Sequence, residues 1–426
     1  MSIRRNIVAN YIGVGFVALA PILALPWYIK ILEPKYWGLV SFISILNGIL
    51  GLASAGLSQT LVREFARQIV DQENGKKRIA RILFGFERIY WIFAIFAAII
   101  LDTFAGTISI HWMNLGDIPV EIGRAVVSGA AAIFAVQFPL AIYRNVLLGC
   151  GEQVKLNLLQ SVGAVMKHIG GVLALFVYPS IFTYLIWFVI ATLLETLITA
   201  QQSWLFLQVR RSTQKWNYLE LKKLYVFALS MSASVILGVL TMQVDKLVIS
   251  WMMPIEQLGY YSIASAVAIG LLQIFSPIAS AVQPKIVQLH EQPEALKRLN
   301  LKVLALMMSM LGVLIITFLL AGKAILALWL HNQDMVEIVY PIMTVLVIGT
   351  GMNGIYNVGY MNWLSTGAIK KILQTNTISL LLALIITPLL IIKYGLIGAA
   401  CGWLILNCVG LILSLDWLKI SRVKHA

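Results

Sequence analysis

Charged residues are scarce in this sequence. Of its 426 residues, only 12% are Asp, Glu, Lys or Arg, whereas 60% are hydrophobic. About a quarter of the residues are charged in a typical water-soluble domain, so this composition excludes a soluble globular protein. It is typical of a polytopic α-helical membrane protein, and we therefore expect the lipid bilayer to be its surroundings.

Acidic residues are the scarcer of the two charged kinds. The chain has 18 Asp and Glu against 32 Lys and Arg, which gives a formal net charge of +14. In a soluble protein this excess would suggest a nucleic acid partner. In a membrane protein, however, the cytoplasmic loops collect Lys and Arg as a determinant of topology. We therefore expect no nucleic acid partner.

Cysteines are few, and common catalytic motifs are missing. The three cysteines, Cys150, Cys401 and Cys408, form no CxxC motif and no Cys/His cluster. The sequence therefore predicts neither a disulfide framework nor a zinc site. It also lacks the GxxxxGK[ST] phosphate-binding loop, which excludes ATP hydrolysis through that motif. We expect no metal and no cofactor.

Long polar segments are missing as well. The longest predicted outer stretches, GTISIHWMNLGDIPVEI and AGKAILALWLHNQDMVE, are too short for a folded domain. A membrane glycosyltransferase or polymerase usually needs a substantial catalytic region outside the membrane. We expect the polar residues that such a catalytic site could use to be ordinary exposed loop residues, and we predict no enzymatic activity. These residues are His111, Asp117, Glu121, His331 and Asp334.

Apolar runs dominate what is present. Twelve stretches have the length of about 20 mostly apolar residues that a membrane-spanning helix needs. They are 7–29, 37–62, 83–105, 121–147, 157–178, 181–207, 224–251, 258–283, 302–320, 338–363, 373–392 and 396–417. The first is expected to be a retained span, because the run is long and lacks the small-residue cleavage site of a signal peptide.

The distribution of Lys and Arg predicts the orientation. If the N-terminus is cytoplasmic, the inner segments hold 24 of these residues and the outer segments five. The remaining three, Arg88, Lys167 and Lys246, lie within predicted spans. Because cytoplasmic loops carry the excess of Lys and Arg, both termini are predicted to be cytoplasmic and the number of spans to be even.

The two halves of the chain resemble each other. Residues Gly151, Lys155, Tyr178 and Trp187 recur 216 positions later as Gly367, Lys371, Tyr394 and Trp403. A repeat of this length predicts two pseudo-symmetric six-helix bundles around a central cavity, with lobes at 1–213 and 214–426. Six spans return the chain to its starting side, so the halves share one topology and a substrate path is expected between them.

Ionisable residues within spans are the sharpest indication of a site. At membrane depth such a residue costs at least ~2.5 kcal/mol. Lys167 lies near the centre of span 157–178, with Gln160 on its face, and Glu195 lies mid-way along span 181–207. Their depths should agree within ~3 Å. Two interpretations remain open: a neutral structural pair, or a cluster that faces the central cavity.

Two further cations in the first half are candidates for substrate binding. Arg88 lies in span 83–105 near the predicted cytoplasmic edge, where its side chain can either reach the interface or face the cavity. Arg144 shares a face of span 121–147 with Gln137 and is either a cytoplasmic anchor or a phosphate-binding group at the cavity mouth.

The second half contributes polar and acidic candidates. Asn353 and Asn357 are one helical turn apart in span 338–363 and are candidates for contact with a substrate. Asp245 shares a helical face with Gly238 and Thr241 and is a candidate cavity or ion-coupling residue. Its neighbour Lys246 points about 100° away and is either an outer anchor or a cation at the cavity rim.

Several stretches, taken in order, resemble a known transporter family. These stretches are ILEPKYWGLVSF (31–42), GLSQTLVREFARQ (56–68), LTMQVDKLVISWMMPIEQLGYYSIASAV (240–267) and IFSPIASAVQPKIVQL (274–289). Together they resemble the polysaccharide-transport branch of the multidrug/oligosaccharidyl-lipid/polysaccharide exporter superfamily, which comprises Wzx-type flippases of lipid-linked oligosaccharides. The resemblance covers essentially the whole chain.

The resemblance implies a function and a location. It implies two rocking bundles in a bacterial inner membrane that move an undecaprenyl-pyrophosphate-linked glycan from the cytoplasmic to the periplasmic leaflet. Lys167, Arg88 and Arg144 could supply the cationic cavity, and Asp245 matches an acidic position often seen in such proteins. A proton or sodium gradient could be coupled through Asp245 or Glu195, and the glycan polymerase machinery is a candidate partner.

Two other functions remain as alternatives. A multidrug exporter of organic cations in the same superfamily would need an acidic and aromatic cavity. In the predicted spans here, however, Lys and Arg lie at least as deep in the membrane as Asp and Glu. A membrane-embedded glycan transferase or polymerase would need a catalytic cluster on an outer loop.

Overall fold

The computed structural model describes residues 3–216, 218–272, 278, 282–283, 285–289 and 292–422. These residues are almost entirely helical, and none of them is in a β-strand. The chain divides into two compact units, residues Met1–Ile236 and Leu237–Ala426. The division falls inside one long helix, so a continuous helix leads from the first unit into the second.

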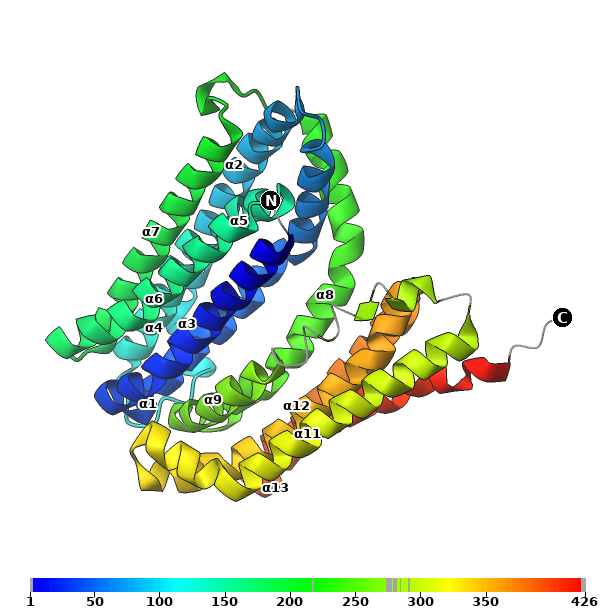
Figure 1. Ribbon diagram of the computed structural model, residues 1–426. Helices are drawn as coiled ribbons and strands as arrows, with labels where there is room; N and C mark the ends of the chain where they lie inside the picture. Colours follow the sequence, from blue (N-terminus) through cyan, green and yellow to red (C-terminus); the bar gives the residue numbers. More distant parts are fainter. Residues whose placement is uncertain are drawn as a thin grey trace. The chain divides into compact units, whose positions relative to one another are not determined.

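The described part of the N-terminal unit contains seven helices, a short 3₁₀ turn and the start of an eighth helix. They are α1 (Ile3–Gln68), α2 (Gly75–Thr103), α3 (Ala105–His111), α4 (Val120–Gln137), α5 (Leu140–Gly149), α6 (Gln153–Val177), α7 (Ile181–Leu207), η1 (Arg211–Thr213) and the first part of α8 (Tyr218–Met252). Helix α6 packs against both α1 and α7, and α4 packs against α2 and α7 (Figure 1).

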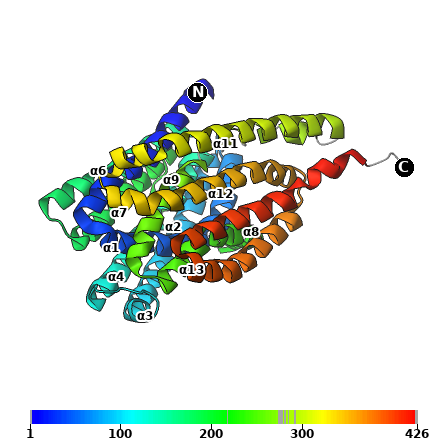
Figure 2. The same cartoon turned by 90° about the horizontal axis from the view of Figure 1, so that it is seen from below.

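The described part of the C-terminal unit is built around α12. Its elements are the rest of α8, α9 (Ile255–Gly270), α11 (Pro293–Leu330), α12 (Gln333–Ser365), α13 (Ile369–Ser414) and η2 (Leu415–Arg422). Helix α12 contacts α9, α11 and α13, and Figure 2 shows it lying between α11 and α13. Two buried asparagines join α11 to α12, since the Asn300 amide donates to the Asn362 side-chain oxygen at 3.0 Å.

Apolar side chains cover the outside of both units as well as filling their cores. In the N-terminal core, Phe65, Phe86 and Phe134 are fully buried. On the outside, Ile92 and Leu320 are 68% and 83% exposed. Such exposure would be costly in water, at about 25 cal/mol for each Å² of apolar surface. In lipid it costs nothing, which agrees with the predicted multi-pass membrane protein.

The predicted spans correspond to helices wherever the structure describes them. Within the described residues, eight helices are long and apolar enough to cross a membrane. Two of these contain a break: predicted spans 7–29 and 37–62 are the two arms of α1, and 373–392 with most of 396–417 are the two arms of α13. Span 121–147 comprises α4 and α5.

Each break follows from the local sequence. In α1 it lies at Glu33, with φ 65°, directly before Pro34, because a proline disfavours helical conformation in the residue before it. In α13 it lies at Gly395, with φ 58° and ψ −136°, a conformation that only glycine adopts readily. Helices α4 and α5 separate at Pro139, which lacks the backbone donor that a continuous helix would need.

Some predictions concern residues beyond this description. Span 258–283 and the stretch 274–289 fall partly on residues outside the described ranges. The number of twelve spans and the lobe boundaries at 1–213 and 214–426 therefore stay predictions.

Candidate functional site

The polar face of α7 is buried inside the N-terminal unit. It consists of Thr192, Glu195, Thr196, Thr199 and Ser203, which follow one another at helical spacing. The Thr196 hydroxyl donates a hydrogen bond to the Val136 carbonyl at 2.8 Å. The Ser203 hydroxyl donates to the Tyr143 carbonyl at 3.1 Å. These bonds hold α7 against both sides of the break between α4 and α5.

Glu195 joins two cations from two other helices. The Arg144 guanidinium of α5 donates a short hydrogen bond to Glu195 Oε1. The Lys167 Nζ atom of α6 lies 2.8 Å from Glu195 Oε2. The Glu195 side chain is 2% exposed, whereas those of Arg144 and Lys167 are 32% and 19% exposed. This cluster of three, the Glu195 cluster, carries a net charge of +1 and presents its cations rather than its carboxylate.

The sequence predicted one pair of this cluster and missed the other. The pairing of Lys167 with Glu195 was expected from their similar depth, and the structure confirms it. Arg144 was considered separately, as an anchor or a phosphate-binding group, and its contact with Glu195 was not foreseen. The break at Pro139 determines how α5 approaches α7, and the sequence alone does not give that direction.

The backbone of α6 is fixed on both sides of Lys167. The Tyr28 hydroxyl of α1 donates to the His168 carbonyl at 2.8 Å. The Trp187 indole of α7 donates to the Met166 carbonyl at 3.0 Å. Hydrogen bonds from two neighbouring helices therefore position the segment that carries Lys167.

Glycine permits the close approach of α6 to the carboxylate. A β-carbon added at Gly163 would lie 2.5 Å from Glu195 Cδ and 2.7 Å from Glu195 Oε2. Because real β-carbons do not approach other heavy atoms this closely, any side chain at this position would displace Glu195. Gly163 is thus part of the site, although it was not among the residues predicted from the sequence.

A second buried carboxylate, Glu87 of α2, was also missed. The Tyr143 hydroxyl donates to Glu87 Oε1 at 2.5 Å, and Arg211 Nη2 lies 3.1 Å from Glu87 Oε2. The Trp91 indole in turn donates to the Tyr143 hydroxyl at 3.2 Å. The available signal is a charged residue inside an apolar run, next to Arg88.

The neighbouring residues Tyr143 and Arg144 therefore serve different carboxylates. Tyr143 contacts Glu87 of α2, and Arg144 contacts Glu195 of α7. Adjacent residues of a helix point about 100° apart, so the short helix α5 can bridge two helices at one level.

The other candidates in the N-terminal unit lie apart from this cluster or along its edge. Arg88 is exposed, with its guanidinium carbon 4.0 Å from the centre of the Phe84 ring. It shares a helical face with the exposed Ile92 and Phe96. Gln160 is half-buried on α6, two turns before Lys167, and Gln137 is exposed at the end of α4.

In the C-terminal unit the predicted asparagines form a polar network. The Asn353 amide donates to the side-chain oxygen of Asn407 on α13 at 2.7 Å. The Asn357 amide donates to the Asn353 carbonyl and to its side-chain oxygen, at 2.9 and 3.2 Å. All three side chains are half-buried or buried, so hydrogen-bonding groups line this part of α12.

Asp245 is paired with a phenol. The Tyr261 hydroxyl of α9 donates to Asp245 Oδ2 at 2.5 Å, and the Lys246 backbone amide donates to Asp245 Oδ1 at 2.8 Å. The Lys246 ammonium instead lies 3.5 Å from the Met242 carbonyl. Both side chains are buried in the C-terminal unit. Burial of Lys246 does not fit an anchor that reaches the outer surface, which was one of its two predicted roles; the role of a cation at the cavity rim stays a prediction.

The outer-loop groups considered for an enzyme site are exposed. His111, Asp117, Glu121, His331 and Asp334 all lie at the surface. Among the described residues, no group of three or more His, Cys, Asp or Glu is placed to hold a metal ion.

Comparison with known families decides the classification. The family described as "Polysaccharide biosynthesis protein" matches residues 29–333, well over half of the chain. The chain belongs to this family. The resemblance inferred from the sequence is thereby confirmed, and a curated relative supports it: the putative O-antigen transporter of Shigella flexneri is 24% identical over 424 residues, covering 98% of each chain.

Solved structures share the fold. The lipid II flippase MurJ, in an inward closed conformation, matches with a TM-score of 0.75 at 16% identity, over 98% of this chain and 89% of that one. An inward-facing multidrug resistance MATE family transporter of the MOP superfamily matches with a TM-score of 0.77 at 15% identity, over 99% of this chain and 100% of that one. At these identities the likeness establishes the fold of this member of the polysaccharide biosynthesis family.

Proposed function

We propose that this protein is a flippase that translocates undecaprenyl-pyrophosphate-linked oligosaccharide repeat units, of the kind used for O-antigen, capsule or exopolysaccharide. It moves them from the cytoplasmic to the periplasmic leaflet by alternating access. The proposal is supported by the family, by the Shigella flexneri relative named as a putative O-antigen transporter, and by the fold shared with a lipid II flippase.

The Glu195 cluster is the observation that carries the proposal. A pyrophosphate must lose its hydration to enter the membrane, and charged hydrogen-bond donors can replace it. Glu195 is 2% exposed and orients Arg144 and Lys167, whose side chains are 32% and 19% exposed. Two accessible cations on one buried carboxylate leave a net positive charge for an anion, and such a charge acts more strongly in a medium of low dielectric constant than in water.

The proposed architecture follows the sequence analysis. Twelve spans form two pseudo-symmetric six-helix bundles, with lobes 1–213 and 214–426 around a central cavity. Both termini lie in the cytoplasm, and the membrane is the bacterial inner membrane. The breaks at Glu33 and Gly395 support this count, because each divides a long helix into two arms of spanning length.

The mechanism requires movement and no bond chemistry. The cluster receives the pyrophosphate, while the polyprenyl tail stays in lipid. Side-chain amides of Gln137, Gln160 and Asn353 donate hydrogen bonds to the glycan, the Asn357 side-chain oxygen accepts one from a glycan hydroxyl, and Arg88 adds a further cation. The two bundles then need two packings of similar free energy, and the bound substrate shifts the balance between them.

Ion coupling is assigned to the buried carboxylates. Asp245 accepts a hydrogen bond from Tyr261 and has the chemistry to take up a proton or to contact sodium. Glu195 either performs the same role or balances the charge of its two cations. On the periplasmic side the glycan polymerase machinery receives the product.

A second candidate function is an antiporter of organic cations. The fold shared with a MATE family transporter is the observation in its favour. An organic cation, however, would be repelled by a site with two cations for each carboxylate, which favours the anionic lipid-linked substrate.

The decisive experiment neutralises the whole cluster. In the triple variant Arg144→Gln, Lys167→Gln, Glu195→Gln, no bare carboxylate is left in the membrane. We expect normal protein levels and a fall in translocation of about tenfold or more, since two charged hydrogen bonds to the pyrophosphate are lost. Translocation is measured as the fraction of lipid-linked glycan on the periplasmic leaflet in a strain whose own gene is deleted.

A matched variant controls for charge. Arg124→Gln with Lys393→Gln removes two exposed cations elsewhere and should translocate normally. Wild-type translocation by the triple variant would contradict the anion site. Efflux of organic cations by the wild-type protein, without glycan translocation in the same strain, would favour the antiporter.

A further inference from the structure

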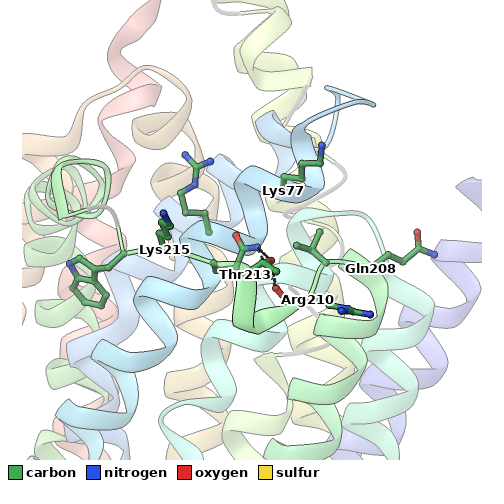
Figure 3. A pocket seen from close by; sticks show the side chains of 9 residues that line it. Lys77, Gln208, Arg210, Thr213 and Lys215 are labelled. Atoms are coloured by element: carbon green, nitrogen blue, oxygen red, sulfur yellow. Dashed lines mark hydrogen bonds between the residues drawn. The ribbon is translucent and has the colours of Figure 1, made fainter.

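A second cationic site lies at the end of the N-terminal unit, around the loop that leads from α7 to α8. A cavity of about 710 Å³ opens there. Its lining includes four cations, Lys77 and Arg81 from the start of α2 and Arg210 and Lys215 from the loop, together with Trp216. Figure 3 shows Lys77 rising from α2 and Lys215 and Thr213 from the loop around one hollow.

The loop has a defined structure. The Thr213 hydroxyl donates to the Arg210 carbonyl at 2.7 Å, and the Gln214 amide donates to the same carbonyl at 3.4 Å. Arg211, between them, is ion-paired at 3.1 Å with Glu87, whose side chain is 2% exposed. These contacts hold the loop between Arg210 and Lys215 in place, so the cavity has an ordered wall.

Three carboxylates near this end of the unit are engaged elsewhere. Glu87 is held by Arg211, Glu64 lies 2.8 Å from Arg67, and Asp71 lies 3.7 Å from Arg78. Among the residues that the structure describes, the cavity lining contains no Asp or Glu. In the described part of the chain, four cations therefore line the cavity and no carboxylate does.

Membrane topology explains why Lys and Arg are frequent here, because cytoplasmic segments collect them. It does not explain why four of them surround one cavity together with a hydroxyl and a side-chain amide. Lys and Arg donate charged hydrogen bonds to phosphate oxygens. Trp216 is 45% exposed, and its ring is of the kind that lies at the level of lipid head groups.

We propose that this cavity binds a phosphate-bearing group. The two sources of such a group at a membrane surface are the head group of an anionic phospholipid and a soluble phosphate compound. The loop that lines the cavity connects α7 to α8, the helix that continues into the second unit. A phosphate group bound in the cavity would therefore stabilise one conformation of this loop. This site is separate from the Glu195 cluster and does not depend on the proposed transport function.

Binding to the full-length purified protein tests the proposal. Phosphatidylglycerol retention is measured by native mass spectrometry, and inorganic pyrophosphate binding by calorimetry in phosphatidylcholine nanodiscs. The test variant is Lys77→Gln with Lys215→Gln. Its matched control, Lys370→Gln with Lys393→Gln, removes the same charge from exposed lysines of the other unit. Any pyrophosphate bound by the Glu195 cluster is the same in both variants.

We expect the test variant to bind one of the probes about 30-fold more weakly than the control, since each basic residue contributes roughly a factor of five at a membrane surface. Loss of phosphatidylglycerol identifies a lipid head group as the ligand, and loss of pyrophosphate identifies a soluble phosphate. If the test variant unfolds, Arg81→Gln alone is measured, with an expected weakening of about fivefold. Equal binding of both probes by test and control variants, or binding of neither probe by the wild type, would overturn the proposal.

Discussion

At the scale of single residues, two buried carboxylates of the N-terminal unit lie where cations from other elements reach them. Glu195 holds Arg144 and Lys167, and Glu87 holds Arg211. A buried ion pair is weak evidence for stability, because the loss of hydration offsets much of the attraction. The arrangement is therefore better explained by a need for oriented, accessible cations than by a need for stability.

Glu195→Gln tests this explanation at one residue. The variant leaves Arg144 and Lys167 without their common carboxylate, and breaking a buried pair in this way costs about 3 kcal/mol or more. Because both cations are partly exposed, we expect a loss nearer to 2 kcal/mol, seen as a lower Tm in detergent.

The neutral triple variant at positions 144, 167 and 195 provides the comparison. It contains no unpaired charge, so its Tm should recover most of the loss. If Glu195→Gln and the triple variant were equally unstable, the unpaired charge of Arg144 and Lys167 would not be the cause of the loss.

At the scale of the helices, short breaks decide which side chains meet. Pro139 separates α4 from α5, and α5 then directs Tyr143 toward α2 and Arg144 toward α7. An unbroken helix over 120–149 would need a backbone donor that Pro139 does not have. The break therefore lets one turn of α5 tie three helices together.

The loop after α7 also links separate elements, because its residue Arg211 contacts Glu87 of α2. Within the described residues, Arg211→Ala would leave Glu87 with the Tyr143 hydroxyl as its side-chain partner. The Arg211 side chain is 59% exposed, so solvent screens the pair, and we expect a loss of only about 1 kcal/mol in the free energy of unfolding. Cleavage of the 208–216 loop by a protease should become several-fold faster, because the loop loses its anchor.

Arg78→Ala is the control for that loop. Arg78 and its partner Asp71 are both exposed, at 51% and 37%, and lie 3.7 Å apart. Such a pair contributes about 0–1 kcal/mol, and the protease sensitivity of the 208–216 loop should not change. Equal sensitivity in the two variants would mean that Glu87 does not anchor the loop.

At the scale of the whole molecule, the excess of Lys and Arg predicts the orientation in the membrane. A reporter that is active only outside the cytoplasm, fused after Asn114, should be active, and the same reporter fused after Gln72 should be inactive. The reason is that the segment around Gln72 is rich in Lys and Arg and the segment around Asn114 is not. The opposite pattern would reverse the proposed orientation and place the cavity beside η1 on the periplasmic side.

Much of the fold could be predicted because lipid imposes strict rules. A helix must be long and apolar to span the membrane, so composition and run length alone locate α2, α6, α7 and α12. Pro34 and Gly395 similarly indicate where long helices break, because each restricts or permits particular backbone angles. These signals act locally and can be read without knowledge of the partners.

The Glu195 cluster shows where this reasoning stops. The match in depth between Lys167 and Glu195 could be calculated from helical rise alone, but the third member, Arg144, could not. Its position depends on the angle at which α5 leaves the break, and Glu87 was missed because nothing local distinguishes a carboxylate that will meet Arg211 from one that reaches water.

The sequence by itself determined that this chain is a helical membrane protein of the polysaccharide biosynthesis family, because apolar length, basic loops and the order of short motifs are properties of the chain alone. The tertiary structure decided which charges meet: Arg144 and Lys167 on one carboxylate, Arg211 on another, and four cations around a cavity that no carboxylate lines. Contacts between distant segments depend on helix direction and packing, and those become known only when the helices are placed side by side.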